Sequence, residues 1–327
     1  MEGPDTSSQN DSSAALRRSR PATTSGSLID LFGVAVELAA SDDDAAAALD
    51  GVLEAGAPAS GAPEMFVTVQ RAPLPVPDRR PDGAYDDLDY WSEAHGPTLR
   101  VPGGTVAIVT DTHVVVGGGD LRDGLHRCLP LVLAALMEHR ACYLLHGAAV
   151  GVEGGAALAL GPSLRGKSTL AAAALREGRV VWADDVVAVR ATPDGIEVSG
   201  LAKPLSVPAE LGIDGAVVRR DRRRLPAGLL GSGSAPLVAV VVLAHGTTPR
   251  GGLRPLTGTV VLPELIRSVF RVGDRPPVTA FFAVVAAMAR VPAFELAHGT
   301  DAASRLDVAG GLLDNLDTAL VADAPVD

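Results

Sequence analysis

The chain has 327 residues, of which 47% are hydrophobic, and a formal net charge of −11. This length suffices for one large domain or two smaller ones. The acidic balance argues against bulk nucleic-acid binding, and no apolar run reaches the roughly 20 residues that span a bilayer. Two cysteines, Cys128 and Cys142, are too few for a disulfide framework, so we expect both to be buried free thiols. Together these features predict a cytoplasmic protein that binds neither nucleic acid nor membrane.

The first 140 residues predict a leader followed by an α+β region. Residues 1–27 are polar and contain no apolar core, which is typical of a disordered leader. The apolar and turn residues then predict a strand over 28–40, a helix over 42–56, a loop over 72–87 and a hairpin over 105–119. Asp120 can cap a helix that runs to about Arg140. The region 28–140 contains no motif that we can interpret, but it is a candidate for substrate recognition.

Residues 141–327 alternate strands and helices around one Gly-rich loop. Two strands joined by a turn at 153–155 precede the loop, and a helix that stops at Gly178 follows it. Further expected elements are a strand that ends in two acids, a hairpin turned at 193–195, a strand at 237–246 and helices near 260–271, 278–290 and 301–320. This order predicts an α/β domain with a mixed sheet, rather than the parallel sheet of a simple doubly wound fold.

The Gly-rich loop, GPSLRGKS from residue 161, satisfies the GxxxxGK[ST] pattern. Its glycines let successive N–H groups point at phosphate oxygens beside a helix N-terminus. Lys167 is one of only two lysines in a chain with 26 arginines, and its slender ammonium can reach the β- and γ-phosphates. Arg165 could contact phosphate or lie in solvent. The predicted nucleotide-binding residues are Gly161, Ser163, Arg165, Gly166, Lys167, Ser168 and Thr169.

Two adjacent acids, Asp184 and Asp185, end the strand that returns from the loop helix, 17 residues beyond Lys167. A carboxylate there could hold Mg²⁺ together with the Ser168 hydroxyl, and a second could take a proton from an attacking hydroxyl. The alternation of a strand would point the two side chains to opposite sides. An ordinary acidic turn at the end of a strand is the alternative.

His146 lies in the strand before the loop strand, in the segment LLHGAAV. By itself, a histidine in an apolar strand is usually a core residue. However, HGAAV, ALALGPSLRGKSTLAAAAL and VVWADDVVAV together resemble the core of the HPr serine kinase/phosphorylase family. The resemblance covers about residues 140–210 and extends weakly to 291–304. It is closest to the HPr-kinase-like enzymes that tailor peptides, such as lasso-peptide kinases.

The resemblance implies the P-loop fold that this family shares with phosphoenolpyruvate carboxykinase, with ATP and Mg²⁺ as cofactors. It implies catalytic roles for His146, Lys167 and Asp184, with Asp184 as general base, and a metal site at Ser168 and Asp185. Thr169 stands where HPr kinases have Glu. Relatives often carry a basic residue near Lys203, which makes Lys203 a candidate for phosphate or substrate contact.

An arginine cluster, RRDRRR at 219–224, predicts either a solvated loop or a loop that grips an acidic peptide or phosphate. The sequence as a whole predicts a kinase that phosphorylates a hydroxyl, most plausibly a Ser of a peptide or small protein. Two alternatives stay open: a small-metabolite kinase and a nucleotide-binding accessory protein that transfers no phosphate. A homo-oligomer also stays open.

Overall fold

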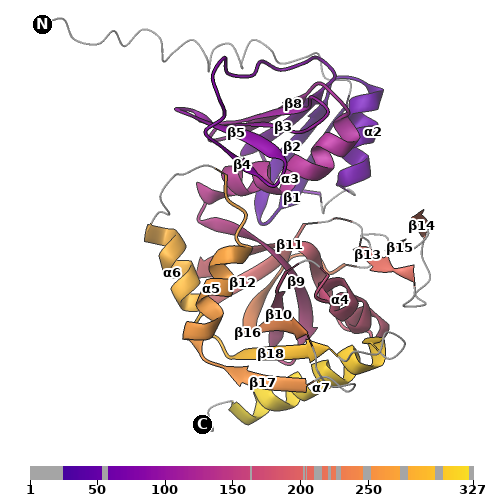
Figure 1. The fold of residues 1–327 in the computed structure, drawn as a ribbon, viewed down its shortest axis with the longest axis vertical. Helices are drawn as coiled ribbons and strands as arrows, with labels where there is room; N and C mark the ends of the chain where they lie inside the picture. Colours follow the sequence, from indigo (N-terminus) through magenta and orange to yellow (C-terminus); the bar gives the residue numbers. More distant parts are fainter. Residues whose placement is uncertain are drawn as a thin grey trace, which may run out of the picture.

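The computed structural model describes residues 25–53, 58–162, 164–201, 203, 205–209, 216–219, 222–225, 230–245, 252–272, 279–298 and 305–323. Within these ranges, strands form two large sheets and one small sheet, and six helices accompany them. Figure 1 shows the N-terminal sheet at one end of the molecule and the loop-bearing sheet at the other, with α3 between them. The predicted α/β architecture is confirmed, because both large sheets are mixed.

The N-terminal region consists of an eight-stranded sheet and two helices. The strands run in the spatial order β1-β2-β3-β8-β7-β6-β5-β4. Their bounds are β1 Ser25–Leu31, β2 Val34–Ala40, β3 Met65–Gln70, β4 Gly83–Tyr85, β5 Leu88–Glu93, β6 Gly96–Arg100, β7 Val106–Val109 and β8 His113–Gly117. The helices are α2 (Asp43–Val52) and α3 (Leu121–Glu138). Asp42 and Asp120 accept hydrogen bonds from the first-turn amides and thereby cap these helices.

Three expectations for this region need correction. The single strand expected at 28–40 is a hairpin, because Phe32 (φ 61°) and Gly33 (φ 80°) turn the chain in the left-handed region. The last three residues of the predicted leader, from Ser25, belong to β1, while the rest of the leader lies outside the described residues. The short strand β4 lies within the loop expected at 72–87, and strands β3, β5 and β6 had no sequence signal that we recognised.

The second sheet contains seven strands in the order β10-β9-β11-β12-β16-β18-β17. They are β9 Cys142–Val152, β10 Gly155–Leu160, β11 Val181–Thr192, β12 Gly195–Gly200, β16 Ser234–His245, β17 Gly252–Leu256 and β18 Ala293–His298. The first residues of β16 pair with β12 and later ones pair with β10, so the sheet folds back on itself. The accompanying helices are α4 Lys167–Arg176, α5 Gly258–Ser268, α6 Thr279–Met288 and α7 Arg305–Asp323.

A small antiparallel sheet follows β12. Its strands are β13 Leu205–Pro208, β14 Ala216–Arg219 and β15 Arg222–Leu225, in the order β13-β15-β14. The arginine cluster at 219–224 therefore lies on two paired strands, where Arg219 is opposite Arg222, and not in the loop that its charge predicted. Strand pairing satisfies the hydrogen-bonding groups of the backbone whatever charge the side chains carry. A run of charged residues therefore does not exclude a strand.

One apolar core joins the two halves of the chain. Leu125, Leu129 and other buried residues of α3 pack in the same cluster as Leu144 of β9 and Val186 and Ala188 of β11. Helix α3 also packs on the N-terminal strands β6, β7 and β8. Helix α3 therefore fixes the N-terminal region directly above the strands that carry the candidate site. None of the helices that the structure describes combines the length and apolarity needed to cross a bilayer.

The two thiols are free and buried, as predicted. Burial raises the pKa of both Cys128 and Cys142 to about 12. At pH 8 roughly one thiol in 10,000 would then be a thiolate, against about a quarter for an unperturbed cysteine. We expect Ellman's reagent to modify the native protein at least ~100-fold more slowly than the protein in guanidinium chloride. Rapid modification of either thiol in the native protein would show that this core is open.

Candidate active site

The Gly-rich loop connects the end of β10 to the N-terminus of α4. The backbone reverses through three positive φ angles, at Gly161 (143°), Leu164 (64°) and Gly166 (99°). A Cβ at Gly161 would lie 3.2 Å from the Leu243 carbonyl oxygen, so another residue there would strain the backbone and push the loop away from β16 by a few tenths of an ångström. Ser163 lies outside the described residues. The loop thus places the N-terminal amides of a ten-residue helix at the end of a buried strand, which is an anion-binding arrangement.

Lys167 is buried, with a relative exposure of 7%, and its ammonium turns back onto its own loop. The Nζ atom donates to the carbonyl oxygens of Gly161 (2.6 Å) and Pro162 (3.1 Å). Burial lowers the pKa of Lys167, and the carboxylates of Asp184, Asp185 and Glu264 oppose that effect. Lys167 is therefore held inside the concave side of the loop, close to both acids.

The acid pair lies in the middle of β11 and not at the end of a strand, because β11 continues to Thr192. At the position where we expected the strand to end, the backbone is irregular. Asp185 has a φ of 124°, a conformation that L-residues rarely adopt. Both carboxylates act on the ammonium groups of Lys167 and Lys203.

Asp185 binds two partners with its two oxygens. His146 Nδ1 lies 3.0 Å from Oδ1, and the Lys203 ammonium pairs with Oδ2. Burial by itself raises the pKa of Asp185, but the hydrogen bond from His146 and the charge of Lys203 outweigh it, so this pKa lies below its usual value. The contact with Nδ1 leaves Nε2 of His146 directed elsewhere. Asp185 therefore orients an imidazole that is one-third exposed.

Asp184 has a different environment. Burial raises its pKa to about 6, against a hydrogen bond from the Ser168 hydroxyl and the charges of Lys167 and Lys203. Ser168 is therefore the hydroxyl that favours the charged form of Asp184. The structure brings Lys167, Ser168 and the acid pair together with His146 and Lys203, whereas Thr169 is buried in α4 and Leu164 is 94% exposed at the tip of the loop.

Helix α5 and the residues after it lie along one side of the site. The sequence analysis did not predict this contribution. The carboxylate of Glu264 acts on Lys167 from this helix. The Phe270 amide donates to the Leu144 carbonyl (2.8 Å), and the Phe270 ring meets the edge of His146 at 5.9 Å between centroids. One sequence feature could have indicated this role: Glu264 is the only charged residue between Gly258 and Ile266.

Helix α3 supplies a second missed residue, His126. Desolvation and the Lys203 ammonium lower the pKa of His126, while Asp185 opposes this effect together with Asp123 of the same helix. A group in α3 can affect these charges only because α3 packs on β9 beside the site. The N-terminal region thus contributes a titratable side chain to the surroundings of the acid pair.

The donor set at the loop suits a hard divalent cation. Ser168 acts on Asp184, and Asp185 follows Asp184 in the chain, so the site offers one hydroxyl and carboxylate oxygens. Among the described residues, no group of three or more His, Cys, Asp and Glu side chains could by itself enclose a metal ion. Mg²⁺ is commonly held by one or two carboxylates plus substrate phosphates, and these residues fit that pattern.

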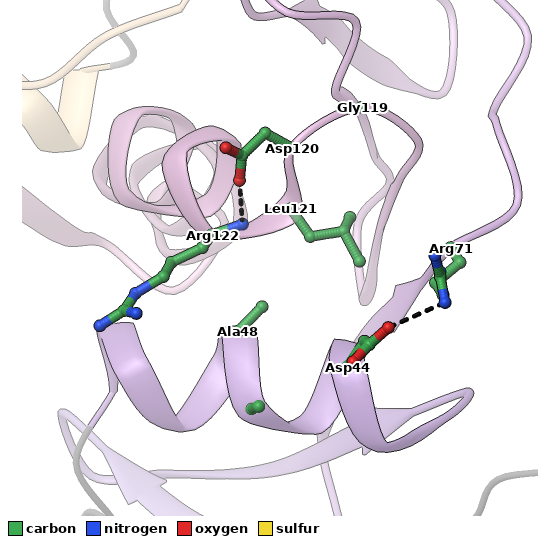
Figure 2. A pocket seen from close by; sticks show the side chains of 8 residues that line it. Asp44, Ala48, Arg71, Gly119, Asp120, Leu121 and Arg122 are labelled. Carbon is green, nitrogen blue, oxygen red and sulfur yellow. Dashed lines mark hydrogen bonds and ion pairs between the residues drawn. The ribbon is translucent and has the colours of Figure 1, made fainter.

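A separate hollow of about 420 Å³ lies between α2 and α3, away from the loop (Figure 2). Its lining consists of Asp44, Ala47, Ala48, Arg71, Gly119, Asp120, Leu121 and Arg122. Asp44 pairs with Arg71 at 2.8 Å, and Asp120 accepts hydrogen bonds from two amides of α3. These acids stabilise the N-terminal region and show no arrangement for chemistry.

Comparison with known proteins leaves the family open. No protein-family model and no curated protein matches the sequence. Among solved structures, the HPr(Ser) kinase/phosphatase from Coxiella burnetii is similar, with 11% sequence identity and a TM-score of 0.29. The match covers 54% of this chain and 98% of that chain.

Lys203 provides a test of this geometry. Replacement by Ala removes one of the two partners of Asp185, and we expect the free energy of unfolding to fall by about 1–3 kcal/mol. Arg71→Ala is the control, because the Arg71–Asp44 pair is 67% and 73% exposed and should contribute less than about 1 kcal/mol. Urea unfolding measures both. Equal losses would show that Lys203 is not integrated in the site.

Proposed function

We propose that the protein is an ATP- and Mg²⁺-dependent kinase that transfers the γ-phosphate to a hydroxyl group, most plausibly a serine of a peptide or small protein. The observation that carries the proposal is the convergence of a GxxxxGKS loop on a helix N-terminus with two partly buried acids and a histidine. The resemblance of residues 140–210 to HPr-kinase-like enzymes supports the same reaction and the class of acceptor.

The loop residues would bind the nucleotide. Its amides and the N-terminus of α4 would hold phosphate oxygens, and Lys167 would exchange its two loop carbonyls for the β- and γ-phosphates. Ser168 and one acid would hold Mg²⁺, which neutralises phosphate charge when bound. Because Ser168 acts on Asp184, while both oxygens of Asp185 already have partners, we assign the metal to Ser168 and Asp184 in place of the Ser168–Asp185 pair that the resemblance implied. The role of general base then passes from Asp184 to His146.

His146 and Asp185 would then serve the acceptor. The acceptor oxygen forms a bond to the γ-phosphorus, and the bond between that phosphorus and the β,γ-bridging oxygen breaks, so that ADP leaves. The proton of the acceptor hydroxyl passes to Nε2 of His146, whose Nδ1–H is held by Asp185. Catalysis would consist mainly of positioning and charge neutralisation.

Substitution of Lys167 tests the kinase assignment. With ATP, Mg²⁺ and a panel of Ser-containing peptides, the wild type should add one phosphate to an acceptor, as detected by mass spectrometry. Lys167→Ala should lower the rate by roughly 100-fold or more, because a positioned cation is lost from the transferring phosphate. An unchanged rate would contradict the proposal. Nucleotide binding without transfer to any acceptor would favour the accessory-protein alternative, and transfer only to small alcohols would favour the metabolite kinase.

The assignment of the two acids has its own test. Asp184→Asn should raise the Mg²⁺ concentration needed for half-maximal activity by roughly ten-fold, because a charged oxygen ligand is lost. His146→Gln should lower kcat by about 100-fold with the Mg²⁺ requirement unchanged, since general-base catalysis contributes 10²- to 10⁴-fold. If Asp185→Asn shifts the Mg²⁺ requirement and Asp184→Asn does not, the assignment of the two acids is reversed.

A further inference from the structure

The chain that leaves helix α5 takes over one edge of β9 at the point where β10 ends. Strand β10 last pairs with β9 at Ala148. Three residues earlier in β9, Leu145 pairs with Val269, and the Leu144 carbonyl accepts a hydrogen bond of 2.8 Å from the Phe270 amide. Strand β11 occupies the other edge of β9 at these positions. Main-chain contacts therefore fix this segment on the edge from which the Gly-rich loop departs.

This anchoring places the ring of Phe270 on the face of β9 that carries His146. Leu144 and His146 are two residues apart, so their side chains leave the same face of the strand. Leu144 belongs to the apolar cluster around α3, and Phe270 packs against that same cluster. The Phe270 and His146 ring centroids are 5.9 Å apart, and the ring planes cross at 78°. This spacing and this angle are those of a favourable edge-to-face contact.

The imidazole of His146 has two neighbours that restrain it in different ways. Asp185 Oδ1 lies 3.0 Å from Nδ1 and holds that atom. One contact at one atom does not fix the ring plane, because rotation about the bond from Cβ to the ring has broad minima. The Phe270 ring, which comes from another segment, restricts that rotation. A general base has to lie within hydrogen-bond reach of the proton it takes, and a small misplacement lowers the rate steeply.

We propose that Phe270 is a positioning residue, whose ring holds the imidazole of His146 in the orientation in which Nε2 takes the acceptor proton. The inference rests on the proposed kinase function and adds the residue that orients its base. The phenyl ring carries no group that binds phosphate or metal. Its substitution should therefore slow the transfer step and leave nucleotide binding unchanged.

Steady-state kinetics with ATP, Mg²⁺ and the Ser-containing peptide that the wild type modifies test the proposal. Phe270→Leu keeps an apolar side chain but removes the ring. It should lower kcat by roughly ten-fold and leave the KM for ATP within about two-fold, because only the orientation of the base changes. Phe270→Tyr keeps the ring and should keep kcat within about three-fold of the wild type.

Phe66→Leu is the matched control. Phe66 is also partly buried, and its ring stacks on the imidazole of His113 at 4.6 Å, but this pair lies in the N-terminal sheet. The control variant therefore loses a contact between a phenyl ring and a histidine away from the loop. Its kcat should stay within about two-fold of the wild type.

A double variant distinguishes positioning from a general loss of packing. In a His146→Gln background, Phe270→Leu should change kcat by less than about two-fold, because the ring acts through an imidazole that is already absent. A further ten-fold loss in that background would assign Phe270 a structural role and overturn the inference.

Three other results would overturn it: an unchanged kcat for Phe270→Leu, equal losses for the Leu and Tyr variants, or an equal loss in Phe66→Leu. Circular dichroism verifies folding, and Phe270→Met replaces the leucine variant if that variant unfolds. If the wild type transfers phosphate and His146→Gln lowers kcat, an unaffected Phe270→Leu variant overturns this inference alone. A wild type that transfers no phosphate overturns it together with the proposed function.

Discussion

The register of the β9–β11 pair is the constraint on which the candidate site depends. His146 lies opposite Val186, and Gly147 lies opposite Asp185. On the other edge of β9, Ala148 pairs with Ala159, so β10 gives way to the loop two residues later, level with His146. A slip of one residue in either ladder would turn His146 to the opposite face of the sheet. The loop, the histidine and the acids thus meet through main-chain pairing alone.

The charged groups of the site stabilise one another. Asp184 and Asp185 lie near Lys167 and Lys203, which are the only two lysines of the chain. Each lysine has a local partner: loop carbonyls for Lys167 and a carboxylate for Lys203. Burying a charge without a partner is costly, so the two cations and two acids form a set in which the loss of any member affects the others.

Sequence patterns predicted the local part of this arrangement well. The loop, its helix and the flanking hairpins follow from short-range signals: glycine spacing, apolar periodicity and turn residues. Those signals could not reveal Glu264, Phe270 or His126, which approach the site from distant segments through tertiary packing. They also placed the acids at a strand end, because no pattern indicates that the strand continues beyond the positive φ at Asp185. Strands β3, β5 and β6 had no sequence signal that we recognised, and the order of the N-terminal sheet depends on parallel pairings between remote segments.

The apolar cluster that crosses from α3 to β9 and β11 bears on how such a chain can evolve. Leu144, Val186 and Ala188 find their packing partners on α3, which also completes the N-terminal core. Residues 141–323 separated from that helix would expose a contiguous apolar surface beside the acids. Helix α3 therefore has to be inherited together with the half of the chain that carries the Gly-rich loop.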